Sequence, residues 1–300
     1  VISDLQDTYD LSYQEANHML TSGGYLIYST VDTDIQSTLE HYFSDEDNLP
    51  ETKSAQQLQS AMMVIDNESG DIVGIIGGTG KKEGSLIWDR ATLSTLQPGS
   101  VLKPITVYAT ALEQGLITPI STRDDVPSRF TDTACWPPNN DGIYRGLMDI
   151  KTAVALSLNT VSVNLVDEMT PQACCSFARN NLHISTFVEN RDGLTDLTSW
   201  GMGMGSLAYG CNLEEITEAY AAFANNGLYR TGRTYTKITG VDGKVILYNE
   251  QDKNQALSTK NAYYMTEMLE ETVKSGTGKG AKLQNMPVAG KTGTTDDDFD

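Results

Sequence analysis

The order of apolar and polar positions predicts a leading segment followed by a larger domain of mixed helix and strand. The leading residues contain four features of local structure: a polar helical lead-in (1–24), a strand (25–31), a helix (32–43) and a polar connection (51–57). An acidic stretch over residues 44–50 separates the helix from that connection. We therefore expect a linker or pre-domain segment over residues 1–56 and the main domain over residues 57–300.

The main domain opens with two short apolar runs on either side of a turn at Gly70, which favours a β-hairpin over residues 61–76. The later residue patterns predict helices over 100–114, 150–168, 171–181, 213–226 and 258–274, a hairpin over 235–248, and a strand over 286–295. Residues 121–149 have the composition of a loop. Because strands precede and follow the helices, the pattern predicts an α+β fold in which helices flank an antiparallel sheet completed by early and late segments.

Composition then narrows the classes of function. The chain has 300 residues, of which 39% are hydrophobic, enough for a folded core. Its net charge of −19 argues against a nucleic-acid partner, because such proteins present a basic face. No run of about 18 uncharged apolar residues occurs, so no membrane span is predicted within these residues.

Metal, cofactor and histidine-dependent chemistry have little support in the sequence. The four cysteines, two of them adjacent, form neither a disulfide framework nor a zinc spacing, and the three histidines are scattered. The glycine-rich run 201–205 loosely resembles a phosphate loop, but it lacks a clear preceding strand and a Lys-Ser/Thr ending. Met202 and Met204 within it are interpreted as core residues. We expect no cofactor and no metal.

A Ser-x-x-Lys element supplies a candidate nucleophile. Ser100 follows Pro98-Gly99 at the start of a predicted helix, and Lys103 lies three positions later on the same helix face. Serine is a weak nucleophile that needs a nearby base, and a lysine whose pKa is lowered by burial and neighbouring cations can serve. The free N–H groups at a helix start also favour developing negative charge.

A Ser-x-Asn element follows in two copies, Ser157-Leu158-Asn159 and Ser162-Val163-Asn164. The first copy is preferred, because it closes an apolar run where a helix could turn towards a cleft. In this interpretation Ser157 relays a proton between Lys103 and a leaving amine, and Asn159 orients a substrate amide. Ser162 and Asn164 are then an ordinary polar helix face.

A Lys-Ser/Thr-Gly element also has two copies. The copy at residues 274–276 precedes a glycine-rich run and is interpreted as a flexible turn. The copy at residues 291–293 follows a β-like segment, so it is preferred. There Lys291 supplies positive charge, Gly293 lets a substrate backbone approach, and Thr292 and Thr294 can bind a carboxylate. The Thr294 N–H can pair with that of Ser100 as an oxyanion hole.

Together these elements resemble the transpeptidase domain of class A penicillin-binding proteins, a family of serine acyltransferases. The resemblance covers about residues 25–300 and rests on continuous stretches as well as the triplets. These stretches are LQPGSVLKP at 96–104, WPPN at 136–139 leading through YRG at 144–146 to Ser157, AYAAFAN at 219–225, and GKTGTT at 290–295. Residues 25–36 resemble the linker that precedes this domain.

The resemblance implies a function. Ser100 attacks the penultimate D-Ala carbonyl of a D-Ala-D-Ala stem peptide, and an amine of a neighbouring stem takes up the acyl group to cross-link peptidoglycan. β-Lactams acylate the same serine. The alternatives are a carboxypeptidase or β-lactamase that transfers the acyl group to water, and a non-catalytic module that senses β-lactams or binds peptidoglycan.

The resemblance also implies partners and a location. Class A proteins carry an N-terminal glycosyltransferase domain and a membrane anchor, and they work on the extracytoplasmic face of the bacterial membrane. Neither feature is recognisable in this sequence. The family continues beyond the third motif into further strands and a helix, so we expect a domain incomplete at its C-terminus.

Overall fold

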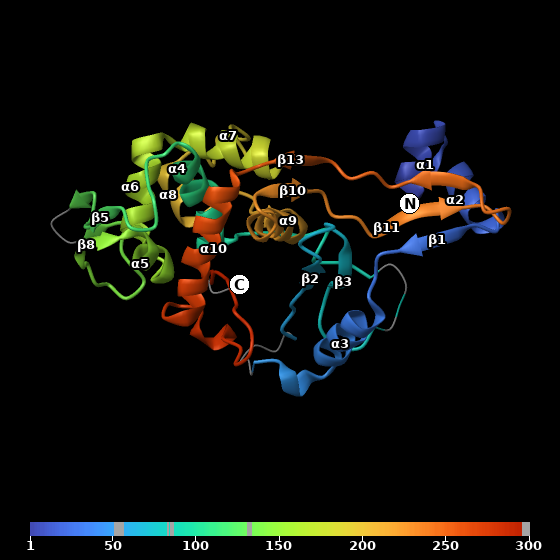
Figure 1. The fold of residues 1–300 in the computed structure, drawn as a ribbon, viewed down its shortest axis with the longest axis horizontal. Helices are drawn as coiled ribbons and strands as arrows, with labels where there is room; N and C mark the ends of the chain where they lie inside the picture. Colours follow the sequence, from blue (N-terminus) through green and yellow to red (C-terminus); the bar gives the residue numbers. More distant parts are fainter. Residues whose placement is uncertain (51–56, 83, 85–86, 131–133, 296–300) are drawn as a thin grey trace. The chain divides into compact units, whose positions relative to one another are not determined.

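The computed structural model describes residues 1–50, 57–82, 84, 87–130 and 134–295. The chain folds as two compact units, which Figure 1 draws as one ribbon. The first unit contains residues 1–88 and 230–253, and the second contains residues 89–229 and 254–300. The chain passes from one unit to the other between residues 88 and 89, and again within β10 (Leu228–Arg230) and β13 (Lys253–Gln255). The boundary expected between residues 56 and 57 stays a prediction.

The first unit joins the beginning of the chain to a late hairpin. Its antiparallel sheet has the order β1 (Leu26–Ser29), β11 (Tyr235–Thr239), β12 (Val245–Tyr248), so the late hairpin is confirmed and an early strand completes the sheet. The polar lead-in forms two helices, α1 (Ile2–Tyr9) and α2 (Tyr13–Ser22). They are separate because Asp10 adopts a left-handed conformation and Ser12 begins α2 with a capping box.

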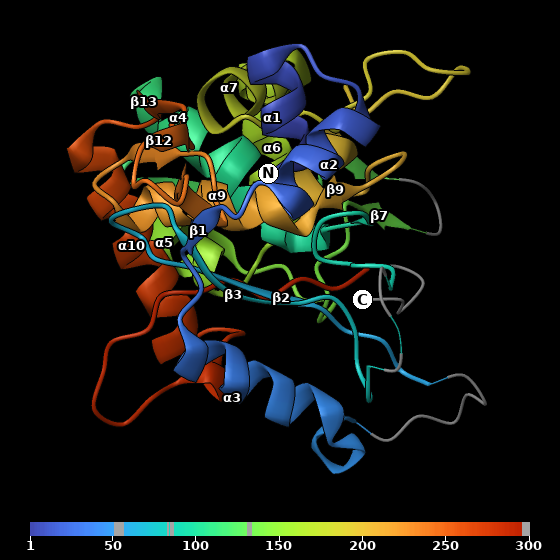
Figure 2. The same ribbon diagram turned by 90° about the vertical axis from the view of Figure 1, so that its right-hand side faces the viewer.

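A second layer of this unit packs α3 (Thr33–Ser44) beside the predicted hairpin of β2 (Met62–Ile65) and β3 (Ile72–Ile76). Both hydrogen bonds between the Gln36 side chain and the backbone of Ile75 are 2.9 Å long and hold the helix against β3. Asp32 caps α3 with its carboxylate, and a 3₁₀ turn, η1 (Glu46–Asn48), follows. Figure 2 shows α3 running beside these strands.

The second unit surrounds one buried helical segment. This segment changes from a 3₁₀ turn, η2 (Gly99–Leu102), to a π turn, η3 (Pro104–Tyr108), and then to α4 (Ala109–Glu113). Residues 102–112 are buried throughout, and the polar residues among them, Lys103, Thr106 and Thr110, are hydrogen-bonded. The other helices of the unit are α5 (Ile150–Ala155), α6 (Asn159–Met169), α7 (Pro171–Leu182), α8 (Ser199–Met204), α9 (Leu213–Ala224), α10 (Thr259–Lys274) and the 3₁₀ turn η4 (Lys279–Ala281).

Three sequence expectations are wrong in this unit. Residues 121–149 contain two strand pairs that were expected to be loop, β5 (Thr122–Asp125) with β8 (Gly146–Asp149) and β6 (Arg129–Phe130) with β7 (Cys135–Trp136). These strands are only two to four residues long, too short to show the alternation that reveals a strand. A further pair joins β4 (Thr95–Leu96) to β9 (Cys211–Asn212). The predicted helix 150–168 is interrupted between α5 and α6, because Ser157 has a φ of 57°.

The third wrong expectation is the strand predicted over residues 286–295. These residues form no strand, because no neighbouring segment in the described chain offers them a ladder of hydrogen bonds. The fold class is otherwise confirmed, because helices and antiparallel strands combine and an early strand pairs with a late hairpin.

The glycine-rich run 201–205 is helical rather than a phosphate loop. It belongs to α8, whose Met202 is fully buried, and α8 packs against α6. Met204, by contrast, is only half-buried. Gly205 ends α8 with a φ of 82°, and a Cβ there would lie 2.0 Å from the Gly99 carbonyl oxygen. This close approach places the end of α8 directly against the residue before Ser100.

Gly205 and Gly193 allow a matched test of that approach. Both have a φ near 80°, but a Cβ on Gly193 would meet nothing within 4 Å. Gly193→Ala should therefore cost only the strain of a left-handed backbone, about 1–2 kcal/mol. Gly205→Ala should lower the free energy of unfolding by roughly a further 1–3 kcal/mol, because the added methyl overpacks the interface. Denaturant titration measures both, and equal losses would contradict the contact.

Candidate active site

Ser100 lies at the first turn of the buried helical segment. Its residue is 9% exposed, and the preceding Gly99 has a φ of 53°. The Tyr220 hydroxyl, from α9, donates to the Val101 carbonyl of this turn at 2.8 Å. Further along the same segment, the Thr106 hydroxyl donates to the Met202 carbonyl of α8 at 2.7 Å. The nucleophile candidate is therefore held by packing from α8 and α9.

Lys103 lies one 3₁₀ turn after Ser100, and in that geometry positions i and i+3 are aligned. Its side chain is fully buried, and Nζ donates to the Ser157 carbonyl at 2.8 Å and to Asn159 Oδ1 at 2.7 Å. Burial, with a smaller contribution from the charge of Lys291, holds the pKa of Lys103 well below its ordinary value. Burial therefore favours the neutral amine, which is the form that can accept a proton.

Ser157 stands between two lysines. Lys291 Nζ donates to Ser157 Oγ at 2.7 Å, and Lys103 Nζ lies 3.5 Å from the same oxygen. The left-handed φ of Ser157 produces this position, because it turns the chain sharply between α5 and α6. A hydroxyl that accepts from one ammonium and lies beside a second amine is suited to pass a proton between them.

Asn159 begins α6 and has its amide fully engaged. Oδ1 accepts from Lys103, and Nδ2 donates to the Pro138 carbonyl at 2.7 Å. In this structure the side chain holds the lysine in place. The role in orienting a substrate amide, which the sequence suggested, stays a prediction.

The third motif lies against the first. A Cβ on Gly293 would be 2.8 Å from the Pro98 carbonyl, and one on Gly99 would be 2.5 Å from the Thr294 carbonyl. Burial lowers the pKa of Lys291 to about 8, and its Nζ also donates to the Thr292 carbonyl at 2.8 Å. The eight residues proposed from sequence therefore come together: Ser100, Lys103, Ser157, Asn159, Lys291, Thr292, Gly293 and Thr294.

One expected contact is not formed. Within the described residues, Lys103 Nζ makes its hydrogen bonds to Ser157 and Asn159, and none to Ser100 Oγ. Catalytic hydrogen bonds are often loose in a protein without substrate and tighten in the complex. The Ser100–Lys103 pairing therefore stays a prediction.

The competing copies of the motifs have structural roles. The Ser162 hydroxyl donates to the Gly203 carbonyl at 2.7 Å and so joins α6 to α8, while Asn164 on the same helix is half-buried. The Ser275 hydroxyl donates to the Glu271 side chain at the end of α10. Neither copy contacts Lys103 or Lys291, so the copies preferred from sequence are the ones that the fold assembles.

The cysteines contribute no chemistry to this site. Cys174, Cys175 and Cys211 are buried free thiols, and burial raises the pKa of each. Cys135 is a free, exposed thiol. Among the described residues, no cluster of His, Cys, Asp or Glu side chains is suited to hold a metal ion.

Comparison with known proteins identifies the family. A family model described as the penicillin-binding protein transpeptidase domain matches residues 60–297. The chain belongs to the penicillin-binding protein transpeptidase family. The resemblance inferred from the motifs is thereby confirmed.

Individual members of the family cover almost the whole chain. Penicillin-binding protein 1A of Clostridium acetobutylicum is 31% identical over 99% of the chain, and the protein of the same name from Clostridium perfringens strain 13 is 27% identical over all of it. The chain spans only 38% and 46% of those two proteins. PonA1 of Mycobacterium tuberculosis, solved in complex with penicillin V, has the same fold with a TM-score of 0.77 at 24% identity, covering 98% of this chain and 75% of that one.

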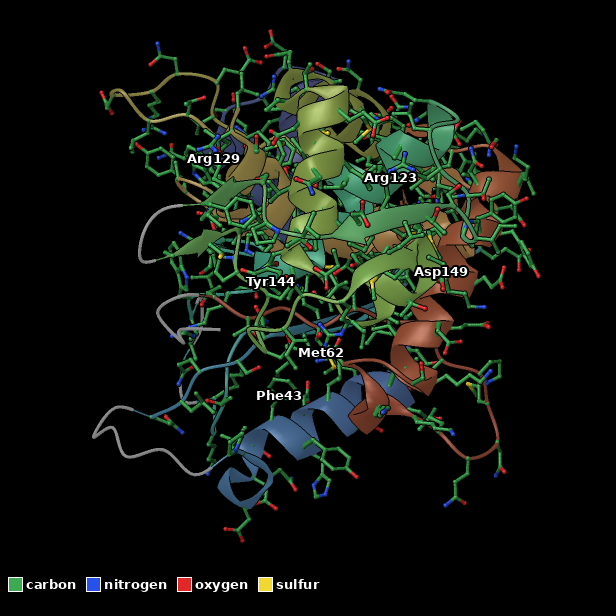
Figure 3. All side chains as sticks on the ribbon, turned by 90° about the vertical axis from the view of Figure 1, so that its left-hand side faces the viewer. Phe43, Met62, Arg123, Arg129, Tyr144 and Asp149 are labelled. Carbon is green, nitrogen blue, oxygen red and sulfur yellow. The ribbon has the colours of Figure 1, made fainter. Side chains whose placement is uncertain are left out.

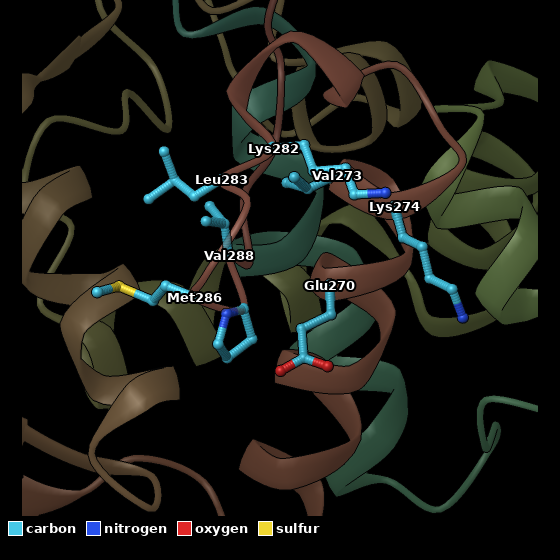
Figure 4. A pocket seen from close by; sticks show the side chains of 8 residues that line it. Glu270, Val273, Lys274, Lys282, Leu283, Met286 and Val288 are labelled. Carbon is cyan, nitrogen blue, oxygen red and sulfur yellow. The ribbon is translucent and has the colours of Figure 1, made fainter.

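Two of the pockets formed by the described residues lie within the second unit. One, of 390 Å³, is lined by Arg129, Trp136, Trp200, Met204 and Ser206, next in sequence to the Gly205 that contacts Gly99. The other, of 170 Å³, lies between the C-terminal half of α10 and residues 282–288. Figure 4 shows Glu270 and Met286 on different walls of the second pocket. None of its lining residues belongs to the three motifs, so it is not the candidate active site.

Sequence reasoning missed three residues that support the site. The Thr277 hydroxyl lies 2.7 Å from that of Thr292 and so fixes a member of the third motif. Asn139 accepts the backbone N–H of Asn159 at 2.9 Å, and Asp125 in turn accepts from Asn139 at 2.6 Å. The WPPN stretch pointed to Asn139. Thr277 and Asp125 carried no motif signal.

The left-handed backbone at Ser157 can be tested by two substitutions that remove the same hydroxyl. Ser157→Gly relieves the conformational strain, whereas Ser157→Ala retains it. The glycine variant should therefore be more stable than the alanine variant by about 1 kcal/mol. Thermal or denaturant unfolding of the two variants gives the difference. A more stable alanine variant would show that residue 157 does not adopt this conformation.

Proposed function

We propose that this chain carries out the acyl-enzyme chemistry of a peptidoglycan D,D-transpeptidase. The observation that carries the proposal is the buried cluster in which Lys103 and Lys291 both approach Ser157, with residues 293–294 packed against the turn that holds Ser100. A buried lysine with a depressed pKa beside a nucleophile candidate has no purely structural advantage, because burying an amine costs free energy. Such perturbed groups concentrate at functional sites.

Acylation begins with proton transfer. Neutral Lys103 removes the Ser100 proton as Oγ attacks the penultimate D-Ala carbonyl of the donor peptide. The N–H groups of Ser100 and Thr294 stabilise the oxyanion. As the tetrahedral intermediate collapses, the C–N bond breaks, and the amine of the terminal D-Ala receives a proton from Lys103 through the Ser157 hydroxyl. The ester on Ser100 is left behind.

Transfer of the acyl group to the acceptor amine uses the proton path through Ser157 and Lys103 in the opposite direction. The amine of a second stem peptide attacks the ester carbonyl and gives up a proton along the Ser157 path, and Ser100 Oγ leaves with a proton from Lys103. Lys291, Thr292 and Thr294 bind the donor's terminal carboxylate, with Gly293 allowing the peptide backbone to approach. A β-lactam presents a similarly placed carboxylate and acylates Ser100 without releasing a leaving group.

Two alternative functions, a hydrolase and a non-catalytic β-lactam sensor, can each be weighed against one observation. A hydrolase needs a base for its water. Asp125, a buried carboxylate linked to Asn159 through Asn139, is already held by the donors of Asn139, Thr160 and Arg145. That arrangement disfavours a β-lactamase. A non-catalytic β-lactam sensor is favoured only by the missing Ser100–Lys103 hydrogen bond.

We also propose the setting of the full-length protein. The chain spans 35–46% of the Clostridium penicillin-binding proteins 1A that it matches, so the full-length protein has room for an N-terminal glycosyltransferase domain and a membrane anchor. Peptidoglycan substrates require the domain to work on the outer face of the membrane. In the described residues no helix has the length and apolarity to cross a bilayer.

Covalent labelling of the full-length protein by a fluorescent penicillin tests the nucleophile. We expect labelling at Ser100 that Ser100→Ala abolishes, and Ser275→Ala, in the competing Lys-Ser-Gly copy, should label like the unaltered protein. Labelling that persists in Ser100→Ala would overturn the assignment. Incubation with a D-Ala-D-Ala peptide and an amine acceptor then separates the reactions, since a cross-linked product indicates a transpeptidase and free D-Ala without it indicates a hydrolase.

The charge on Lys291 should limit labelling at high pH. Because burial lowers its pKa to about 8, the ammonium that attracts the ligand carboxylate loses its proton above that pH. Labelling at a low penicillin concentration should therefore fall as the pH rises through 8. Lys291→Arg should move this fall to higher pH, because a guanidinium keeps its charge. If labelling falls at the same pH in both proteins, another group causes the loss at high pH.

A further inference from the structure

Asp125 is a buried carboxylate at the end of β5, with a full set of donors. Its residue is completely inaccessible to solvent. Oδ1 accepts from Asn139 Nδ2 at 2.6 Å and from the Thr160 hydroxyl at 2.5 Å, while Oδ2 accepts from the Arg145 backbone N–H at 2.9 Å. The Arg145 guanidinium lies 3.8 Å away and balances the charge. A buried carboxylate is stable only when it is satisfied in this way.

Two partners of Asp125 act at the start of α6, a helix that has no cap of its own: Thr160 belongs to its first turn, and Asn139 accepts from its first N–H groups. Its N-cap residue is Leu158, whose side chain cannot accept a hydrogen bond. Asn139 supplies the missing acceptor from a distant segment, since its Oδ1 accepts the N–H of Asn159 at 2.9 Å and that of Thr160 at 3.5 Å. The first turn of α6 is therefore fixed by Asn139.

Asp125 decides which way the Asn139 amide faces. The carboxylate can only accept, so it selects the NH₂ end of that amide, and the Ile143 carbonyl does the same at 2.9 Å. The oxygen end is then left to face α6. Figure 3 labels Arg123 and Asp149 on the paired strands β5 and β8, and Tyr144 on the segment between Asn139 and β8.

The chain of contacts ends at the candidate base. The backbone N–H of Asn159 is held by Asn139, and the side-chain oxygen of Asn159 accepts from Lys103 Nζ at 2.7 Å. We propose that Asp125 is a positioning residue for acylation, because its carboxylate holds Asn139 in the orientation that seats Asn159 against Lys103. This inference rests on the proposed function and assigns Asp125 no contact with substrate.

Asp125→Asn is the most informative variant. It keeps the size and shape of the side chain but replaces one acceptor oxygen with an NH₂ donor. Asn139, Thr160 and Arg145 all direct donors at residue 125, so the NH₂ end of a new amide must face another donor. Asp124→Asn is the matched control: it makes the same charge change on the adjacent, exposed residue of β5.

Saturation kinetics of labelling by a fluorescent penicillin, in the full-length protein, measure the effect. Asp125→Asn should lower the acylation rate constant on the order of 10-fold to 100-fold, since a small misplacement of a reacting group has such effects. The half-saturating penicillin concentration should change little, because Asp125 does not touch the ligand. Asp124→Asn should match the unaltered protein.

A double-mutant cycle separates positioning from general destabilisation. If Asp125 acts through Asn159, the Asp125→Asn substitution should lose most of its effect on the acylation rate in an Asn159→Ala background. Equal effects in the two backgrounds, or an unaltered rate in Asp125→Asn itself, would overturn the inference. If Asp125→Asn does not fold, Asn139→Ala takes its place, because it breaks the same link and leaves the carboxylate paired with Arg145 and Thr160.

The outcomes also distinguish the two proposals. If the unaltered protein is not acylated at Ser100, the proposed function fails. If it is acylated at Ser100 but Asp125→Asn behaves like Asp124→Asn, only the inference about Asp125 fails.

Discussion

The burial of one amine, that of Lys103, is the constraint on which the site depends. An ammonium removed from water is costly unless it finds acceptors or gives up its proton. Here it finds the Ser157 carbonyl and Asn159 Oδ1, and the proximity of Lys291 disfavours a second charge. The same burial that lowers the pKa of Lys103 is what makes the amine available as a base.

Meeting this constraint requires irregular backbone in the second unit. The helical segment that contains Ser100 passes from a 3₁₀ turn to a π turn before it becomes regular, and Ser157 adopts a left-handed conformation. Such features cost free energy and persist where the surrounding packing enforces them. At Ser157 the result is a carbonyl and a hydroxyl that both face Lys103 Nζ.

Hydrogen bonds from residues around the motifs hold the irregular backbone in one conformation. Tyr220 holds the Ser100 turn, Thr106 joins the same segment to α8, Thr277 holds Thr292, and Asn139 caps the helix that begins with Asn159. These supporting groups come from separate segments of the second unit. The geometry of the candidate site is therefore set by packed helices and capped helix ends, with short strand pairs contributing.

The sequence by itself determined the family, the candidate side chains of the site and most helices, because these depend on local residue types and on motifs that keep their order. Tertiary structure decided the rest. It placed the Ser157 hydroxyl between Lys103 and Lys291, because the chain turns sharply between α5 and α6, and it left residues 286–295 without strand pairing. It also recruited Asp125 and Thr277, whose contacts with Asn139 and Thr292 span 14 and 15 residues and leave no periodic signal. A strand needs a partner and a buried charge needs donors, and both are supplied by segments that the local pattern does not specify.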